Sequence, residues 1–323
     1  MVSGVTPDSL CRGGVRFRAG GTDTCLRHAQ PERPHMPWYF FAILGALLDA
    51  VYYALIKKSL KDVNQYVFGS GAFFTACILL LTISWLRGFP ALDAQFWYAA
   101  IASSLLNAVA ASFYFKALRL TDLSLALPMI SFTPLFLILT SWFMLSEAPS
   151  WYGALGILLI VAGSYVLNFT SSKLPLLAPL QAIYRNKGAL LMGGVALVYS
   201  VTTNLDKIIV VHSDPYFSSA IVFLFLGVLF AARAARAGRQ ARTRARQKIP
   251  AVLTAGLLSA GAAVAANIAF TSQIVPYVIS LKRLAVVFSV ILGALFFKEK
   301  NLLTRSLGAS LMFTGVVIIL LFQ

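Results

Sequence analysis

The stretch EAPSWYGALGILLIVAG, residues 147–163, comes back in outline 152 residues later as EKNLLTRSLGASLMFTG, residues 299–315. Both begin with a glutamate and carry glycines at the tenth and the last position. Each leads into a run without charged side chains, residues 148–172 and 306–323. About 20 apolar residues in a helix cross a hydrocarbon core roughly 30 Å thick, and a backbone in lipid must be helical because lipid offers its polar groups no partners. The sequence therefore predicts one kind of membrane helix that is used twice.

The composition of the whole chain also indicates a membrane protein. Of its 323 residues 59% are hydrophobic and 12% are charged, whereas about 25% of the residues in a soluble domain are charged. Further runs without a charged side chain cover residues 66–85, 94–115 and 123–146. A β-barrel would need side chains that alternate in polarity, and a run such as Ile157 to Val161 does not alternate. The predicted fold class is an all-α integral membrane protein.

Charges and prolines interrupt the apolar runs and divide the chain into ten expected membrane spans. The uncharged run from Ile249 to Leu281 is too long for one helix, and Pro276 divides it because the residue before a proline is pushed out of the helical region. The expected spans are residues 38–56, 66–86, 95–116, 124–146, 151–169, 188–210, 216–232, 250–272, 275–297 and 303–322.

The ten spans form two units of five, related by a nearly constant offset. Near the front of each half, Val51, Leu55, Lys57 and Tyr66 recur 150 residues later as Val201, Leu205, Lys207 and Tyr216. Because five is an odd number, the second unit lies upside down relative to the first, as in many secondary transporters. We therefore expect two inverted five-helix repeats, residues 36–170 and 188–323, joined by a linker at residues 171–187.

The basic residues test this arrangement, because positively charged loops stay in the cytoplasm. The connections after expected spans 1, 3, 7 and 9 and the linker between the halves are basic, whereas those after spans 4 and 8 carry no base. In a ten-span chain all the basic connections fall on one side. The prediction is a multi-pass protein of the cell inner (plasma) membrane with cytoplasmic basic loops and both termini outside. The arginine-rich connection at residues 233–248 is interpreted as a solvated topology anchor, with binding of anionic lipid as the alternative.

Residues 1–35 differ from everything after them. They contain arginines, glycines and prolines but no apolar segment that would make a signal peptide, so we expect a disordered tail. Its arginines conflict with an N-terminus outside the cell. Because Met36 directly precedes the first apolar run, a start at Met36 is the favoured explanation, and a translated but unstructured extension is the alternative.

The motifs of both halves resemble the repeat of EamA-type permeases in the drug/metabolite transporter superfamily. In the first half these are FKALRLTDLS (residues 115–124), SFTPLF (131–136) and the stretch at 147–163, and in the second half ISLKRLA (279–285) and GALFFKEK (293–300). The resemblance covers residues 36–323. It implies ten helices in two inverted repeats and transport of small metabolites by alternating access. The second half departs from the first where Val286 replaces Pro134, which predicts that a helix distortion has been exchanged for cationic charge.

An ionisable side chain inside a span costs at least about 2.5–3.5 kcal/mol and is a functional candidate by default. Asp49, followed by Tyr52 and Tyr53, is the clearest case in span 1, either as a counter-charge or proton carrier or as the structural partner of a buried base. Lys282 and Arg283 in span 9 are the complementary candidates. One of them would bind substrate or act in gating, and the alternative is an ion pair with Asp49 or Asp206.

Polar side chains in four other spans complete the candidate set. Asn204 and Asp206 face different sides of span 6, and solvation at the membrane interface is the favoured reading for both. Asn107 and Asn267 are expected to line the cavity or to bond between helices. The list closes with Ser131, Thr133 and Pro134, which predict an irregular, backbone-exposing place in span 4 or an ordinary packed kink. Glu147 and Glu299 are interpreted as groups that stabilise helix termini.

The predicted function is secondary transport of a small metabolite, such as an amino acid, a related metabolite or an amphipathic amine, with proton coupling through Asp49 as an option. The alternatives are a flippase for a lipid-linked substrate, a non-transporting scaffold and a membrane-embedded enzyme. The chain has no P-loop motif, which argues against an ATP-driven pump. It also lacks clustered catalytic residues and CxxC spacing, so we expect no catalytic residue, metal or cofactor. The partners are the solute and the bilayer, not nucleic acid, and a monomer is sufficient in principle.

Overall fold

The computed structural model describes residues 17–19, 22–24, 37–59, 63–121, 128–168, 186–236, 238–297 and 302–323. The chain divides into two compact units, Met1–His35 and Met36–Gln323. In the first unit, strands β1 (Phe17–Ala19) and β2 (Thr22–Thr24) pair in antiparallel fashion. The sequence places Gly20-Gly21 between them, a pair typical of tight hairpins. These six residues are thus paired where an unstructured tail was expected, and the start at Met36 stays a prediction.

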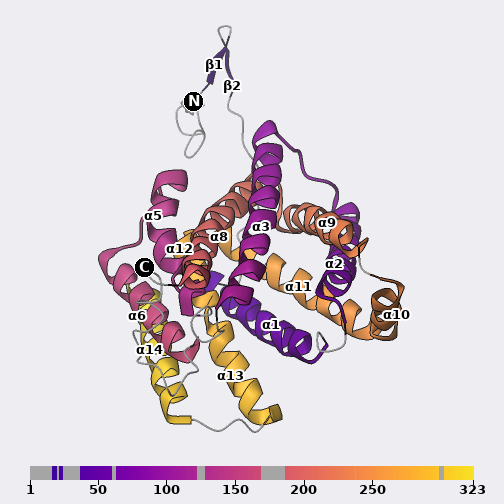
Figure 1. Ribbon diagram of the computed structural model, residues 1–323. Coiled ribbons are helices and arrows are strands. Elements are labelled where there is room, and N and C mark those ends of the chain that lie inside the picture. Colours follow the sequence, from indigo (N-terminus) through magenta and orange to yellow (C-terminus); the bar gives the residue numbers. More distant parts are fainter. Residues whose placement is uncertain are drawn as a thin grey trace, which may run out of the picture. The chain divides into compact units, whose positions relative to one another are not determined.

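All the regular secondary structure that the structure describes in the second unit is helical (Figure 1). Its helices are α1 (Trp38–Ser59), α2 (Gln65–Arg87), α3 (Ala94–Leu120), α5 (Thr133–Leu145), α6 (Trp151–Asn168), α8 (Lys187–Val211), α9 (Pro215–Ala234), α10 (Arg239–Gln247), α11 (Ile249–Phe270), α12 (Val275–Lys282), α13 (Leu284–Phe297) and α14 (Leu302–Phe322). Eight segments are long and apolar enough to cross a membrane, and α6 and α14 contain shorter apolar segments, Trp151–Leu167 and Ser306–Phe322. A multi-pass membrane protein is therefore confirmed, and the count of ten crossings stays a prediction.

Polar residues cap the helices where the sequence interrupts its apolar runs. The side chain of Asn64 accepts from the backbone N–H of Tyr66 at the start of α2, over 2.9 Å. Asp93 and Asp214 accept in the same way from the first turns of α3 and α9. These side chains satisfy backbone donors that have no partner within the helix, so each helix begins directly after its cap.

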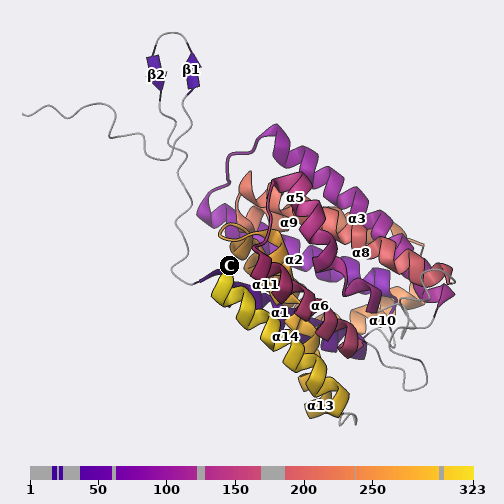
Figure 2. The same cartoon turned by 90° about the vertical axis from the view of Figure 1, so that its left-hand side faces the viewer.

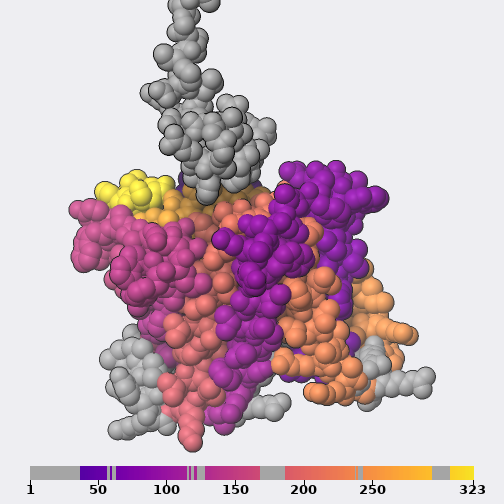
Figure 3. Space-filling model, turned by 90° about the horizontal axis from the view of Figure 1, so that it is seen from above, coloured from indigo at the N-terminus to yellow at the C-terminus, as the bar shows by residue number. Residues whose placement is uncertain are grey.

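The two halves of the second unit are interlaced. Helix α3 of the first half packs against α8 of the second, and α11 of the second half packs against α1 of the first. Helices α2 and α9 pair with each other, as do α6 and α14, which lie side by side in Figure 2. In the space-filling view the yellow C-terminal residues lie beside the magenta α5–α6 segment (Figure 3). Each helix thus finds its main partner in the other half.

Glycines bring α6 and α14 into backbone contact. A Cβ atom at Gly156 would lie 2.7 Å from the carbonyl oxygen of Gly315, and one at Gly308 would lie 2.9 Å from that of Gly163. The repeat relates Gly156 to Gly308 and Gly163 to Gly315, whereas the contacts join them crosswise. Two antiparallel helices related by a twofold axis meet in this way, as inverted repeats require.

The helices of spans 4 and 9 are both broken at equivalent positions. The chain makes a turn at Ser131 and Phe132 before α5 begins, and Arg283 separates α12 from α13. The offset of 152 residues relates Ser131 to Arg283. The prediction that the second half has exchanged its distortion for charge is therefore wrong. The backbone N–H of Arg283 is shared between the carbonyls of Ile279 and Ser280, which breaks the helix without a proline.

The two ends of the second unit lie together. The indole N–H of Trp38 donates to the side chain of Gln323 over 2.9 Å. Gln323 also accepts from Gln273, in the turn between α11 and α12, over 3.0 Å. This shared end of the helical bundle is called the terminal end below.

Candidate functional site

A cavity of about 210 Å³ lies among helices α8, α9, α11 and α12. Its polar lining comes from Asp206, Lys282, Asn267, Thr203, Ser218 and Ser219. The other side chains that line it are apolar, among them Ile209, Val222, Phe223, Phe270 and Ile279. One acid and one base thus share a small space that is otherwise mostly hydrocarbon.

Asp206 projects from α8 into the cavity wall. Its Oδ1 atom accepts a hydrogen bond from the hydroxyl of Ser103 on α3, over 2.8 Å. The Ser103 carbonyl and hydroxyl in turn accept from the amide of Asn107, at 3.0 and 3.3 Å. The favoured reading of Asp206 as a residue solvated at the membrane interface is therefore wrong. The sequence feature that marked Asp206 as a candidate was its position as an acidic residue within a span.

Lys282 connects the cavity to Asp49. Its ammonium nitrogen lies 3.1 Å from a carboxylate oxygen of Asp49, so α12 and α1 are joined by an ion pair. Both side chains are about one-fifth exposed, at 21% each. The sequence left open whether Lys282 or Arg283 would pair with Asp49 or Asp206, and the pair with Asp49 is present. Asp49 therefore contacts Lys282 but is absent from the residues that line the cavity.

Arg283 lies at the break between α12 and α13. Its Nε atom is buried and has no hydrogen-bond partner among the described residues. The side chains of Asp49, Tyr53 and Tyr199 lie near its guanidinium. The ring of Tyr53 is 5.7 Å from that of Tyr52, which packs against the apolar cluster around Phe68. The predicted group on span 1 is thus brought together with both basic residues of span 9.

Asn267 belongs to the cavity, as expected for one of the two midspan amides. Its Nδ2 atom donates to the hydroxyls of Ser219, at 2.8 Å, and Ser218, at 3.2 Å, which joins α11 to α9. Asn107 is absent from the cavity lining and contacts Ser103 on its own helix. Its relation to the site is indirect, through the hydroxyl that bonds to Asp206.

Asn204 is completely buried and lies away from the cavity. Its carbonyl oxygen accepts from Ser141, at 2.7 Å, and its amide donates to Thr140, at 3.0 Å, and to the carbonyl of Ser200. These bonds join α8 to α5, so the expectation that Asn204 is solvated at the interface is wrong. Burial against a second helix, two residues from Asp206, also shows that the two side chains face different sides of α8.

The polar residues of span 4 serve packing in this structure. The hydroxyls of Ser131 and Ser164 lie 3.0 Å apart, and Thr133 donates to the carbonyl of Ile130 over 2.8 Å. Pro134 is buried in the first turn of α5, where its missing N–H costs no hydrogen bond. None of the three lines the cavity. The irregular backbone predicted for span 4 is present at the turn of Ser131 and Phe132.

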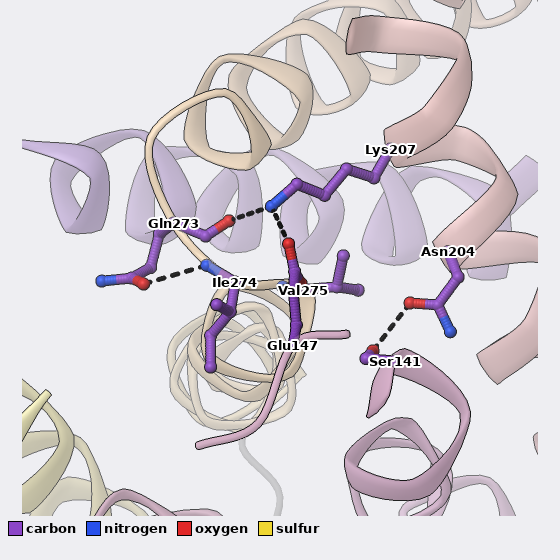
Figure 4. A network of polar contacts seen from close by, with 7 residues as sticks. All are labelled: Ser141, Glu147, Asn204, Lys207, Gln273, Ile274 and Val275. Atoms are coloured by element: carbon purple, nitrogen blue, oxygen red, sulfur yellow. Dashed lines mark hydrogen bonds and ion pairs between the residues drawn. The ribbon is translucent and has the colours of Figure 1, made fainter. Parts of the chain in front are cut away.

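A polar network lies at the terminal end of the bundle (Figure 4). Glu147 forms an ion pair with Lys207 of α8 and accepts from the backbone N–H of Val275, the first residue of α12, over 2.9 Å. Lys207 also donates to the carbonyl of Gln273 over 2.7 Å. Glu147 follows Ser146, whose positive φ of 54° turns the chain at the end of α5. The carboxylate thus stabilises the N-terminus of α12, the role that sequence reasoning assigned to it, whereas Glu299 lies outside the described residues.

Comparisons with known proteins agree with this architecture. The model of the EamA-like transporter family matches the chain twice, over residues 36–169 and 186–321. A solved structure described only as the crystal structure of a protein superposes with a TM-score of 0.70 at 19% identity and covers 88% of this chain and 97% of its own. This similarity concerns the fold alone. No curated protein matches the sequence significantly.

Proposed function

Because the chain belongs to the EamA-like transporter family, we propose that it is a secondary transporter that carries a small solute across the membrane by alternating access. The observation that carries the proposal is the cavity with Asp206 and Lys282 in its wall. Charged side chains inside a membrane protein are expensive and mark the paths of substrates and ions. Two opposite charges at one cavity therefore favour a polar solute.

The size and charges of the cavity favour a small zwitterion, such as an amino acid or a related metabolite. Its volume of about 210 Å³ lies below the roughly 300–1,000 Å³ of pockets that hold drug-sized ligands. The carboxylate of Asp206 suits an ammonium group, and Lys282 suits a carboxylate. An amphipathic amine would use only Asp206. A lipid-linked substrate, the flippase alternative, finds less support in so small a space.

Asp49 gives the proposed site a route to proton coupling. Its ion pair with Lys282 holds the ammonium group of that residue. Protonation of Asp49 would remove the negative charge and leave Lys282 available for the carboxylate of a substrate. In this proposal Lys282 responds both to the proton, which binds to Asp49, and to the substrate, which binds in the cavity.

The network around Glu147 gives alternating access a structural basis. It holds the end of α5, helix α8 and the start of α12 together at the terminal end. Helix α12 runs from Val275 in this network to Lys282 at the cavity, a rise of about 10 Å at 1.5 Å per residue. A substrate that binds Lys282 therefore contacts the same short helix whose N-terminus is bonded to Glu147. The breaks at Ser131 and Arg283 are the proposed hinges.

A binding screen with matched variants tests the site. The purified protein is screened against small amino acids, other zwitterions and amines for thermal stabilisation, because a ligand that binds only the folded state raises its stability. Hits are repeated on Asp206→Asn and Lys282→Met. The controls are Asp93→Asn and Lys187→Met, which remove the same charges outside the cavity, and asparagine keeps the helix cap at position 93.

The binding screen tests the proposed site, and a separate uptake experiment tests the proposed transport. Loss of the hit in the two cavity variants but not in the controls would support the site, and a hit that all four variants retain would rule it out. Transport itself is tested by uptake of the labelled hit into vesicles that contain the protein. Binding without uptake in wild-type vesicles would exclude the transporter and leave a binding protein.

A further inference from the structure

Helix α10 is a docked surface helix between α9 and α11. Its residue Ala245 is buried, only 8% exposed, in a cluster with Val63, Phe68 and Ala72 at the start of α2. Lys248 alone separates α10 from α11, and the backbone N–H of Val252 donates to its carbonyl over 3.0 Å. The arginine-rich connection is thus held against the bundle, which differs from the freely solvated loop favoured from the sequence.

The outward side of this segment is strongly cationic. Three arginines in and beside α10 are exposed, namely Arg236, Arg244 and Arg246, and they are called the basic surface below. The sequence contains no aspartate or glutamate between Asp214 and Glu299. No acid within this stretch of the sequence therefore offsets the charge of these arginines.

Exposed apolar residues on α11 fix the depth of the basic surface in the membrane. Ile249, Leu253 and Leu257 are 50%, 46% and 52% exposed, at a spacing of four residues that places them on one side of the helix. A stripe of exposed apolar residues on a membrane-spanning helix faces lipid. It begins directly after Lys248, so Arg246 and Arg244, three and five residues before Ile249, lie within about one and a half helical turns, roughly 5–8 Å, of the hydrocarbon boundary. This is the level of the lipid headgroups.

From these three observations we infer that the basic surface binds the phosphate groups of anionic lipids. Arginine forms paired hydrogen bonds to phosphate, and a basic cluster next to a membrane helix is attracted to anionic headgroups. The docking of Ala245 holds the arginines in place, so binding costs less ordering of the chain than it would for a free loop. The ligand is a membrane lipid, because the surface lies beside the lipid-facing stripe of α11.

Lipid titration of the full-length protein tests this inference. The protein in a neutral detergent is titrated with phosphatidylglycerol or with phosphatidylcholine, and bound lipids are counted by native mass spectrometry. The test variant is Arg244→Gln with Arg246→Gln. The matched control is Lys116→Gln with Lys187→Gln, which removes two exposed charges at the ends of α3 and α8 that meet on this side of the bundle.

The expected result is a preference for phosphatidylglycerol that weakens about tenfold in the test variant and less than about twofold in the control. Equal weakening in both double variants, or no preference in the wild type, would overturn the inference. So would displacement of the lipid by inorganic phosphate, because that indicates a site for a free anion. If the test variant does not fold, the wild type decides alone: its preference must fall steeply as salt rises, since exposed charges are screened.

Discussion

The backbone N–H of Val275 donates a hydrogen bond to the carboxylate of Glu147, a residue 128 positions earlier in the chain. The same carboxylate is paired with Lys207. One side chain in a loop of the first half therefore fixes where a helix of the second half begins. That helix carries Lys282 at its other end, so the bond lies on the path between the surface of the bundle and its cavity.

Replacement of Glu147 by glutamine should loosen the start of α12. A hydrogen bond to a charged group contributes about 1.5–3 kcal/mol, so the amide protons of Val275, Tyr277 and Val278 should exchange roughly 10–100 times faster. Hydrogen exchange measured by mass spectrometry checks this. The amides of Tyr216 and Phe217, which Asp214 caps in α9, serve as an internal control. Unchanged exchange at 275–278 would show that the network does not hold α12.

Asp49 and Lys282 should behave as a coupled pair. Asp49→Asn or Lys282→Met alone leaves an uncompensated charge inside the bundle, so each should lower the stability of the folded protein. The double variant should be more stable than the sum of the two effects predicts, by about 1–3 kcal/mol. Thermal unfolding in detergent of all four proteins gives this coupling. The combination of Asp49→Asn with Asp93→Asn, which are not in contact, should be additive.

Alanine at Gly156 should separate α6 from α14. The new Cβ would lie 2.7 Å from the Gly315 carbonyl, and such overpacking costs about 1–3 kcal/mol. Alanine at Gly193 is the matched control, because nothing lies within 4 Å of its added Cβ. It should leave stability unchanged or raise it by up to about 1 kcal/mol, since alanine favours a helix over glycine. Equal effects of the two changes on thermal unfolding would contradict the close contact.

Asp93 should make the stability of the protein depend on pH in the acid range. The carboxylate accepts the backbone N–H of Phe96 and contacts His212, and these contacts lower its pKa below the usual value. The unfolded chain therefore takes up a proton first, at about pH 4, and the stabilisation is lost as pH falls further through the folded pKa. The difference in melting temperature between the wild type and Asp93→Asn, which keeps a cap, should shrink below pH 4. A constant difference from neutral to acid pH would refute this role.

The sequence was a good guide to the fold because apolar runs can be recognised from short stretches of sequence, and the repeat shows how the two halves correspond. Caps such as Asn64 and Asp93 end the apolar runs, and the glycine pairs reveal which helices can touch. The break at Arg283 was not predicted, since it depends on a shared backbone hydrogen bond and no proline signals it. The offset from the break in span 4 was the one available indication.

The functional site was predicted in part. Asp49, Lys282, Arg283 and Asn267 stood out as polar groups inside spans, and the structure brings all four near one cavity. Asp206 and Asn204 were both assigned to the membrane interface, because a sequence cannot show which neighbouring helix covers the end of α8. The packing of α3 and α5 decides that question, and it gives the two residues opposite surroundings.

The interlaced packing of the halves also constrains how the protein is made. When only the first half has been synthesised, α1 and α3 lack their packing partners α11 and α8. Asp49 then has no Lys282 to pair with, and Ser103 has no Asp206. A chain that stops at this stage leaves these polar groups without the partners that they have in the folded structure. The first half therefore reaches its final packing only after the second half has been made.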